Sequence, residues 1–356
     1  MQKGLYHICL LGWLLCSCGG NGAYYTTEDF ARVPKTDAHV HMYTADTTFV
    51  HQARQDNFRL LTIAVEEPPG MALQEQLGIA HHQHYPERVA FAGTLSIANW
   101  NNPHWPEATI SHLDTMIRAG AIAIKFYKTI GMELKDEAGN FVMIDHPRFD
   151  TVLRFLTGKG IPVIGHFGEP KDCWLPLEQM QMNSNRKYYS RHPEFHMYAH
   201  PSYPSYHEQI AARDRMLQKH PQLRFIGAHL GSLEWDTDTL AACLDKFPNM
   251  AVDMAARISD LQFQAMKDRQ KVYGFFIRYQ DRLLYGTDRT AEDDGPTPQF
   301  IHEAWMRDWA FFTSKDTLRS PSFEGVFTGL QLPKTVVDKI YRYNAERWFK
   351  GRPQEQ

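Results

Sequence analysis

Cysteine is scarce in this chain of 356 residues, and the positions of its cysteines exclude two common uses of the residue. Three of the five cysteines, Cys9, Cys16 and Cys18, fall within the first 18 residues, which leaves Cys173 and Cys243 for the rest of the chain. Two distant thiols cannot form a disulfide framework, even in an oxidising compartment. Neither has a second cysteine at CxxC spacing, so both are expected to be buried apolar side chains rather than metal ligands.

An excess of positive charge is also missing. The chain has 38 Lys and Arg against 41 Asp and Glu, a net charge of −3, and no run of basic residues. This balance argues against nucleic acid as a partner. With 43% hydrophobic and 22% charged residues, and only 23 Gly and 20 Pro, the chain can fill a large core, which excludes a disordered or fibrous protein.

No apolar run at the N-terminus is long enough to span a bilayer. Residues 1–18 contain Lys3, an apolar stretch from Leu5 to Leu15, and then Leu15-Cys16-Ser17-Cys18. This pattern resembles a bacterial secretion signal with a lipobox, which implies cleavage before Cys18 and lipidation of its thiol. An ordinary cleaved signal peptide and a misassigned start codon are the alternatives.

A lipobox at Cys18 implies a protein attached to the bacterial cell envelope by its lipid alone, and an ordinary signal implies a secreted periplasmic protein. Residues 19–30, which begin Gly19-Gly20-Asn21-Gly22, would form a flexible tether. Residues 31–352 would then form a single domain, because no linker divides them. Oligomeric state stays open at this stage.

Short apolar runs recur after residue 30, and most of the gaps between them contain stretches of helical character such as 108–118, 148–158, 208–219 and 237–246. Alternation of this kind predicts parallel βα units. Eight such units favour a (β/α)8 barrel, with a doubly wound open sheet as the alternative. The predicted strands are 33–40, 59–65, 89–95, 121–127, 161–166, 223–229, 250–254 and 283–286.

Two insertions interrupt this rhythm. Residues 131–146, with Ala138-Gly139-Asn140 between apolar flanks, predict a hairpin-like excursion after the fourth strand. Residues 169–206, which are rich in Tyr, His, Pro and Met, follow the fifth strand. Loops that follow strands form the active face of a barrel, so both insertions are candidate walls of a substrate site.

Histidine, by contrast, is abundant, with 18 residues. Asp37-Ala38-His39-Val40-His41 ends the first predicted strand. Alternate side chains of a strand share a face, so the imidazoles of His39 and His41 can reach one metal ion. An isolated HxH motif is weak by itself, because such pairs arise by chance in a histidine-rich chain.

Three further residues strengthen the prediction of a metal site. His166 ends the fifth strand, His229 ends the sixth, and Asp288 follows the eighth. The carboxyl ends of barrel strands form one ring, so these side chains are expected to converge with His39 and His41 at its mouth. Five such residues at four strand ends favour a site over histidines buried for packing.

The combination of motifs resembles the amidohydrolase superfamily, and specifically the amidohydrolase-related family that also contains metal-dependent decarboxylases. The resemblance covers roughly residues 34–350. The motifs that carry it are Asp-Ala-His-Val-His at 37–41, Gly-Ala-His-Leu-Gly at 227–231, Tyr-Gly-Thr-Asp at 285–288 and Asn-Ala-Glu-Arg-Trp-Phe at 344–349. The resemblance implies a (β/α)8 barrel with one divalent metal ion, bound by His39, His41, His166 and Asp288, and with His229 beside it.

The chemistry of these groups agrees with that assignment. Three imidazoles and one carboxylate suit Zn²⁺, and they leave Mn²⁺ and Fe²⁺ open. A metal ion with a free position lowers the pKa of bound water to about 7. Asp288 is then expected to accept the water proton, and His229 to bind the water or the carbonyl oxygen. These two residues are the predicted catalytic pair.

Three charged residues are candidates for binding the substrate. Lys125 lies on the fourth strand, where binuclear relatives carry a carbamylated lysine, but an unmodified lysine that binds a carboxylate or caps the strand is favoured here. Lys128 competes for either role. Arg257 is a candidate anion clamp, or a partner of Asp253 or Glu169. Glu169 could bind substrate, although a helix cap or a structural ion pair is the simpler interpretation.

These observations predict a metal-dependent hydrolase in which activated water attacks the carbonyl carbon of a lactone, ester or amide in a small molecule. A non-oxidative decarboxylase of an aromatic or unsaturated acid is the main alternative, since relatives with the same ligands catalyse it. A lipoprotein that binds a metal or a ligand without catalysis is less favoured, because both Asp288 and His229 are present.

Overall fold

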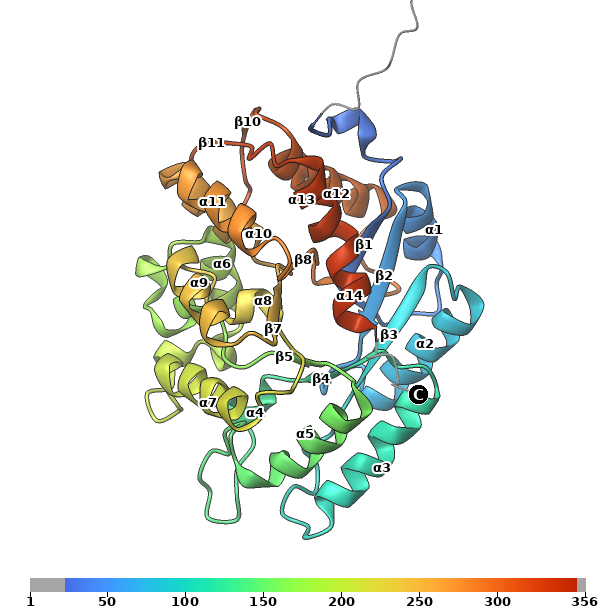
Figure 1. The fold of residues 1–356 in the computed structure, drawn as a ribbon. Helices are drawn as coiled ribbons and strands as arrows, with labels where there is room; N and C mark the ends of the chain where they lie inside the picture. Colours follow the sequence, from blue (N-terminus) through green and yellow to red (C-terminus); the bar gives the residue numbers. More distant parts are fainter. Residues whose placement is uncertain (1–22, 351–356) are drawn as a thin grey trace, which may run out of the picture.

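A curled sheet of parallel strands surrounded by helices forms the body of the protein (Figure 1). The structure, a computed structural model, describes residues 23–350. Within these residues the large sheet has the order β8-β7-β6-β5-β4-β3-β2-β1-β9, and every neighbouring pair in it is parallel. This is the predicted (β/α)8 barrel, and the alternative of an open doubly wound sheet is wrong.

The strands begin and end close to the predicted limits. They are β1 (Lys35–Met42), β2 (Phe58–Ile63), β3 (Val89–Thr94), β4 (Ala123–Phe126), β5 (Val163–Gly165), β6 (Phe225–Gly227), β7 (Met250–Asp253), β8 (Leu283–Leu284), β9 (Arg289–Ala291), β10 (Thr317–Leu318) and β11 (Phe327–Thr328). The last two form a separate antiparallel pair.

The α-helices are α1 (Thr48–Gln55), α2 (Met71–His84), α3 (Trp105–Arg118), α4 (Thr129–Met132), α5 (Pro147–Lys159), α6 (Asn183–Arg191), α7 (Tyr206–Lys219), α8 (Ala228–Gly231), α9 (Thr237–Lys246), α10 (Ile258–Lys267), α11 (Arg269–Tyr279), α12 (Pro298–Thr313), α13 (Lys334–Asp338) and α14 (Asn344–Phe349). Shorter turns are η1 (Thr27–Asp29), η2 (Lys171–Trp174), η3 (Leu177–Gln179), η4 (Pro193–Phe195), η5 (Met197–Ala199) and the π-helical η6 (Lys339–Tyr343). No helix of residues 23–350 is long and apolar enough to cross a membrane.

The barrel closes through a strand that the sequence did not predict. After β8 the chain bends at Gly286–Asp288 and continues as β9, which pairs with the end of β1. Two backbone hydrogen bonds join this bend to β1: the Ala38 N–H donates to the Tyr285 carbonyl (2.9 Å), and the Asp288 N–H donates to the His39 carbonyl (2.8 Å). The buried Asp37 carboxylate accepts hydrogen bonds from the Thr287 N–H and hydroxyl and from the Trp305 indole, which fixes the bend.

The last helix closes the amino-terminal end of the barrel. Small and branched side chains such as Ala38, Ala123 and Ile226 fill the interior, and Trp348 and Phe349 of α14 pack against them. Asn344 anchors the start of α14 through hydrogen bonds to the carbonyls of Gln280 and Leu283. The motif at 344–349 therefore serves packing rather than chemistry.

Replacement of Trp348 with alanine tests this role. Because the indole is buried and its N–H donates to the Asp281 carbonyl, the variant is expected to lose roughly 3–5 kcal/mol of unfolding free energy. Urea denaturation followed by circular dichroism measures this loss. An unchanged midpoint would show that α14 does not contribute to the core.

The predicted tether is shorter than expected at its carboxyl end. Tyr24 forms a β-bridge with Pro333, the Tyr25 hydroxyl donates to Asp338, and Phe30 is buried. These aromatic side chains bury apolar area against α12 and α13, so the segment from Tyr24 onward packs on the barrel instead of remaining flexible. The predicted leader and Cys18 lie outside the described residues.

Both predicted insertions lie on the side of the barrel where the strands end. In 131–146, a bridge between Lys135 and Phe141 forms the expected hairpin. The segment 169–206 contains α6 and four short turns, and it has a small core of its own that includes Cys173, Met180 and Tyr189. Cys173 and Cys243 are both buried free thiols, as predicted.

Candidate active site

A cavity of about 500 Å³ opens at the carboxyl ends of the strands. Most predicted site residues line it, and α6 of the insertion supplies one wall. The lining residues are His39, His41, Glu67, Lys125, Tyr127, Lys128, His166, Glu169, Ser184, Asn185, Tyr188, Tyr189, His229, Ala256, Arg257, Ser259, Thr287, Asp288, Arg289, Thr290 and Ser322.

Three of the four predicted metal ligands have donor atoms close to one another. One nitrogen each of His39 and His41 and one oxygen of Asp288 lie within 4.8 Å of one another. The Asp288 Oδ1 atom is 3.1 Å from His41 Nε2 and 3.4 Å from His39 Nε2. Asp288 has a φ of +63°, a left-handed backbone that the bend after β8 imposes, and this conformation turns its carboxylate toward β1.

The Nδ1 atoms of the His39 and His41 imidazoles already form hydrogen bonds with the protein. His39 Nδ1 lies 2.9 Å from Asp253 Oδ2, and His41 Nδ1 lies 2.8 Å from the Ile63 carbonyl oxygen. Both partners only accept hydrogen bonds, so Nδ1 carries the proton and Nε2 presents a lone pair. Two bare nitrogens and a carboxylate oxygen, all acceptors, therefore face one another, which is the donor set that a divalent cation requires.

His166 is placed beside this group rather than within it. Its ring lies 4.4 Å from that of His229, and its Nε2 atom is buried and has no hydrogen-bond partner among residues 23–350. Buried polar atoms without a partner are rare in folded proteins. A metal ion would satisfy this nitrogen, so the residue fits the ligand set although it is not among the three closest groups.

His229 is held in a strained turn. Four consecutive residues from His229 to Ser232 have φ between +57° and +63°, a conformation that costs non-glycine residues free energy. The His229 N–H donates to Asp253 Oδ1 (2.9 Å), and His229 Nδ1 lies 2.9 Å from the Ala255 carbonyl oxygen. The carbonyl fixes the proton on Nδ1, so Nε2 of His229 is also a hydrogen-bond acceptor.

Burial keeps three of these imidazoles neutral: those of His39, His166 and His229. It lowers the pKa of His39, lowers that of His166 well below its usual value, and lowers that of His229 to about 3. Burial favours the neutral form of Asp288, yet the pKa of its carboxyl group lies well below the usual range. At pH 7 the site thus combines these three neutral imidazoles with the Asp288 carboxylate, the forms that bind metal ions.

Asp253 is a further candidate site residue, for which the sequence suggested only a pairing with Arg257. Its carboxylate accepts hydrogen bonds from the His39 imidazole, the His229 N–H and the Ala255 N–H. Burial opposes its ionisation, yet His39, His229 and Lys125 outweigh burial and lower its pKa to about 2. The residue ends β7, so the signal that identified the other candidates, a polar side chain at a strand end, applied to it as well.

Substitution of Asp253 with asparagine is expected to weaken metal affinity about 10- to 100-fold, because His39 loses the charge that orients it. Competition with a chromogenic chelator measures the dissociation constant. Asp56→Asn is the matched control, since Asp56 is also buried and pairs with a histidine, His302, at 2.9 Å outside the cavity. Equal affinity of both variants would contradict this role of Asp253.

Lys125 projects into the site instead of capping its strand. Its side chain is buried, and Nζ lies 3.4 Å from His39 Nε2. Burial lowers its pKa to about 8. The ammonium group has no salt bridge among the described residues, so it can interact with an anionic group in the cavity.

Glu169 and Lys128 neutralise each other. The Lys128 Nζ atom lies 2.5 Å from Glu169 Oε1, and this carboxylate raises the pKa of Lys128 although burial opposes it. The structure therefore favours the ion pair for Glu169, the simpler of the two interpretations. Lys128 is not a free anion-binding group.

Arg257 has neither of its expected partners, because Asp253 pairs with His39 and Glu169 with Lys128. Its Nε atom is buried and has no hydrogen-bond partner in the described part of the chain, and the side chain lines the cavity. The nearby Asp260 and Glu234 raise its pKa further, against the effect of burial, so the guanidinium is charged. This geometry suits the predicted anion clamp.

Comparisons with known proteins give the family. Residues 33–351 match the family model described as Amidohydrolase. The chain therefore belongs to the amidohydrolase family, and it is an enzyme of that metal-dependent group. No curated protein matches the sequence.

Solved structures similar to this chain are barrels of low sequence identity. The 2,6-dihydroxybenzoate decarboxylase from Rhizobium is 14% identical, with a TM-score of 0.55 over 89% of this chain and 98% of that chain. The 4-oxalomesaconate hydratase from Rhodopseudomonas palustris is 12% identical, with a TM-score of 0.48 over 88% and 95% of the two chains. A probable 2-pyrone-4,6-dicarboxylic acid hydrolase from Acinetobacter baumannii is 14% identical, with a TM-score of 0.46 over 89% and 98%.

Proposed function

We propose that the protein is a metal-dependent hydrolase that cleaves a lactone, ester or amide bond in a small molecule. The observation that carries this proposal is the meeting of two unprotonated imidazole nitrogens and a carboxylate oxygen at 3.1–3.4 Å. Such a cluster of acceptors suits a divalent cation, and the Lys125 ammonium group, 3.4 Å from His39 Nε2, contacts only one of the three atoms. His39, His41, His166 and Asp288 would hold that cation, which is Zn²⁺ by preference, with Mn²⁺ and Fe²⁺ as the alternatives.

A bound divalent metal ion supplies Lewis-acid chemistry, which lowers the pKa of water and polarises a carbonyl group. The protein supplies the proton transfers. Asp288 accepts a proton from the attacking water and delivers it to the leaving group, since its carboxylate is ionised at pH 7. His229 accepts a hydrogen bond from the water at Nε2, which orients one oxygen lone pair toward the substrate carbonyl.

Lys125 and Arg257 would bind an anionic group of the substrate. Both are cations without a salt bridge in the described part of the chain, and both line the cavity. The same two cations support the alternative of a decarboxylase, in which a carboxylate would itself be the reacting group. The 2,6-dihydroxybenzoate decarboxylase that shares this fold performs that reaction, as its name states.

A panel of substrates separates the two reactions. The purified protein is loaded with Zn²⁺, Mn²⁺ or Fe²⁺ and incubated with lactones, esters, amides and aromatic acids. Release of a new carboxylic acid without carbon dioxide is the expected result. Release of carbon dioxide from an aromatic acid would show that the enzyme is a decarboxylase and not a hydrolase. If the protein retained none of these metal ions, both proposed reactions would be wrong.

We also propose that the enzyme is attached to the bacterial cell envelope through a lipid on Cys18. The support is the sequence Leu15-Cys16-Ser17-Cys18 after an apolar stretch. Labelling of expressing cells with a clickable palmitate analogue is expected to modify the wild-type protein but not a Cys18→Ser variant. Equal labelling of both would contradict the anchor, and secretion without labelling would favour an ordinary signal peptide.

A further inference from the structure

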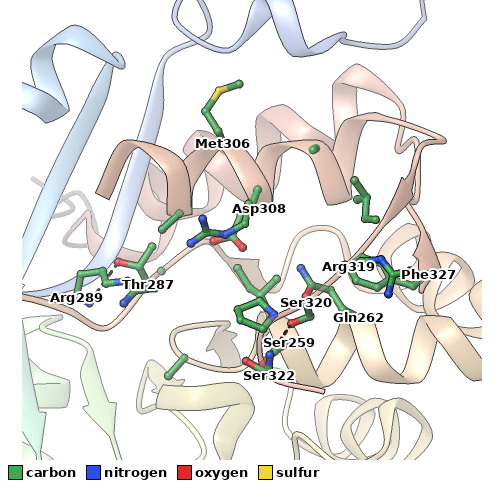
Figure 2. Close-up of a pocket in the computed structure, with 18 residues that line it drawn as sticks. Ser259, Gln262, Thr287, Arg289, Met306, Asp308, Arg319, Ser320, Ser322 and Phe327 are labelled. Atoms are coloured by element: carbon green, nitrogen blue, oxygen red, sulfur yellow. Dashed lines mark hydrogen bonds between the residues drawn. The ribbon is translucent and has the colours of Figure 1, made fainter. Parts of the chain in front are cut away.

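A second cavity, of about 350 Å³, adjoins the candidate active site. It lies between α10, α12 and the segment 318–322, and we call it the arginine cavity. Figure 2 shows Arg289 and Thr287 toward one end, Arg319 and Phe327 toward the other, and Asp308 between them. Five residues line both cavities: Ala256, Ser259, Thr287, Arg289 and Ser322. The two spaces therefore share a wall, and Asp288 of the active site directly precedes Arg289 in that wall.

Positive charge exceeds negative charge around the arginine cavity. Its lining contains Arg289, Arg307 and Arg319 but a single acid, Asp308. The Asp308 carboxylate already accepts a hydrogen bond from the Tyr285 hydroxyl at 2.8 Å. Arg307 has a weak partner, Glu303, at 4.0 Å. A ligand with one negative charge could therefore bind in the cavity, because the arginines would still outnumber the anionic groups.

Two of these arginines form no salt bridge in the part of the chain that the structure describes, although Asp308 lies close enough to Arg289 to interact with its charge. The Arg289 guanidinium lies 4.7 Å from the centre of the Phe300 ring, and its Nε atom is buried without a hydrogen-bond partner. Arg319 is exposed at the far end and forms no salt bridge within residues 23–350. A ligand carboxylate would give either guanidinium a charge-assisted hydrogen bond.

The remaining walls suit an organic ligand. Ile258, Leu318 and Phe327 contribute apolar surface. Ser259, Ser320 and Ser322 contribute hydroxyl groups. Within residues 23–350 the Ser320 oxygen accepts a hydrogen bond from the Ser322 N–H and donates none, so its proton can bind a ligand. Apolar walls with a few polar groups are typical of sites for small organic molecules.

We infer that the arginine cavity binds the carboxylate-bearing arm of the substrate whose reacting group lies in the active site. The identity of that substrate depends on the proposed function. The binding of a carboxylate in the arginine cavity does not. A monocarboxylate on an apolar body fits better than a phosphate dianion, because Asp308 would repel a second negative charge. The enzyme would accordingly prefer substrates with a carboxylate remote from the bond that is cleaved.

Binding of benzoate to the metal-stripped protein tests the inference, with benzamide as the uncharged match. Isothermal titration calorimetry is expected to give an affinity for benzoate at least about tenfold higher than for benzamide. Arg319→Gln and Arg289→Gln are each expected to weaken benzoate binding about fivefold or more, and Arg319→Lys to retain most of it. Arg154→Gln is the matched control, because Arg154 is exposed on α5 and lines neither cavity.

Equal affinities for benzoate and benzamide would overturn the inference. So would unchanged benzoate binding in Arg319→Gln, which is the diagnostic variant because Arg319 lines only the arginine cavity. A loss of binding in Arg257→Gln without a loss in Arg319→Gln would place benzoate in the active site and also overturn it. Because these titrations use protein without metal, failure of the proposed hydrolase, seen as no metal uptake or no turnover, is distinguishable from failure of the arginine cavity.

Discussion

Replacement of both His39 and His41 with alanine is expected to reduce bound metal from about one ion per chain to a small fraction of that, and to lower kcat/KM by at least about 1,000-fold. The two imidazoles present unprotonated Nε2 atoms to the same oxygen of Asp288, so their removal takes away two of the three closest ligands. Metal content by plasma mass spectrometry and turnover on the first substrate identified check both parts of the expectation.

The control for this variant is His104→Ala combined with His207→Ala. Both side chains are exposed and lie outside the cavity, so the control removes the same number of imidazoles without touching the site. A chelator should lower the melting temperature of the wild type and of the control, because the metal binds only the folded chain, and it should have no effect on the variant. Full metal content in the His39/His41 variant would refute the site.

Substitution of Asp288 with asparagine is expected to lower kcat about 100- to 10,000-fold at saturating metal concentration. Asparagine keeps a ligand oxygen and the size of the side chain, but it cannot accept a proton. The proton transfer therefore fails although the site remains assembled. Steady-state kinetics at metal concentrations that fully load both proteins measure the effect.

Asp294→Asn is the control for this substitution, since Asp294 is exposed six residues further along the chain and lines neither cavity. A loss of kcat without a loss of ligand affinity supports proton transfer by Asp288. If Asp288→Asn turned over substrate at the wild-type rate, the carboxylate would not be the base. If neither the wild type nor the variant turned over any substrate but both bound the same ligand, a binding protein would become the better description.

Much of the fold followed from local sequence patterns. The alternation of apolar runs with helical stretches predicted the barrel, and helix α9 has the predicted limits, 237–246. Strand ends were predictable because a buried parallel strand is a short apolar run, and the polar residue that follows it lies at the active face. The family resemblance stated from the motifs is also confirmed.

Other features depend on contacts between segments far apart in the sequence. The closing strand β9 is only three residues long, and it exists because Asp37 holds Thr287 and because β1 offers a free edge. The partners of Glu169 and Arg257 were open alternatives until the structure placed Lys128 beside Glu169. Long-range ion pairs are invisible to spacing rules, which describe neighbours on one helix or strand.

The sequence by itself determined the barrel, the family and the residue types that ring its mouth, because these follow from periodicity and from the ends of strands. Only the tertiary structure decided which imidazole nitrogens carry protons, since this depends on the carboxylate of Asp253 and on the carbonyl oxygens of Ile63 and Ala255. It also decided that the arginine cavity adjoins the active site. Protonation and cavities are properties of packed neighbours, and chain folding brings those neighbours together from β1, β2, β7 and α12.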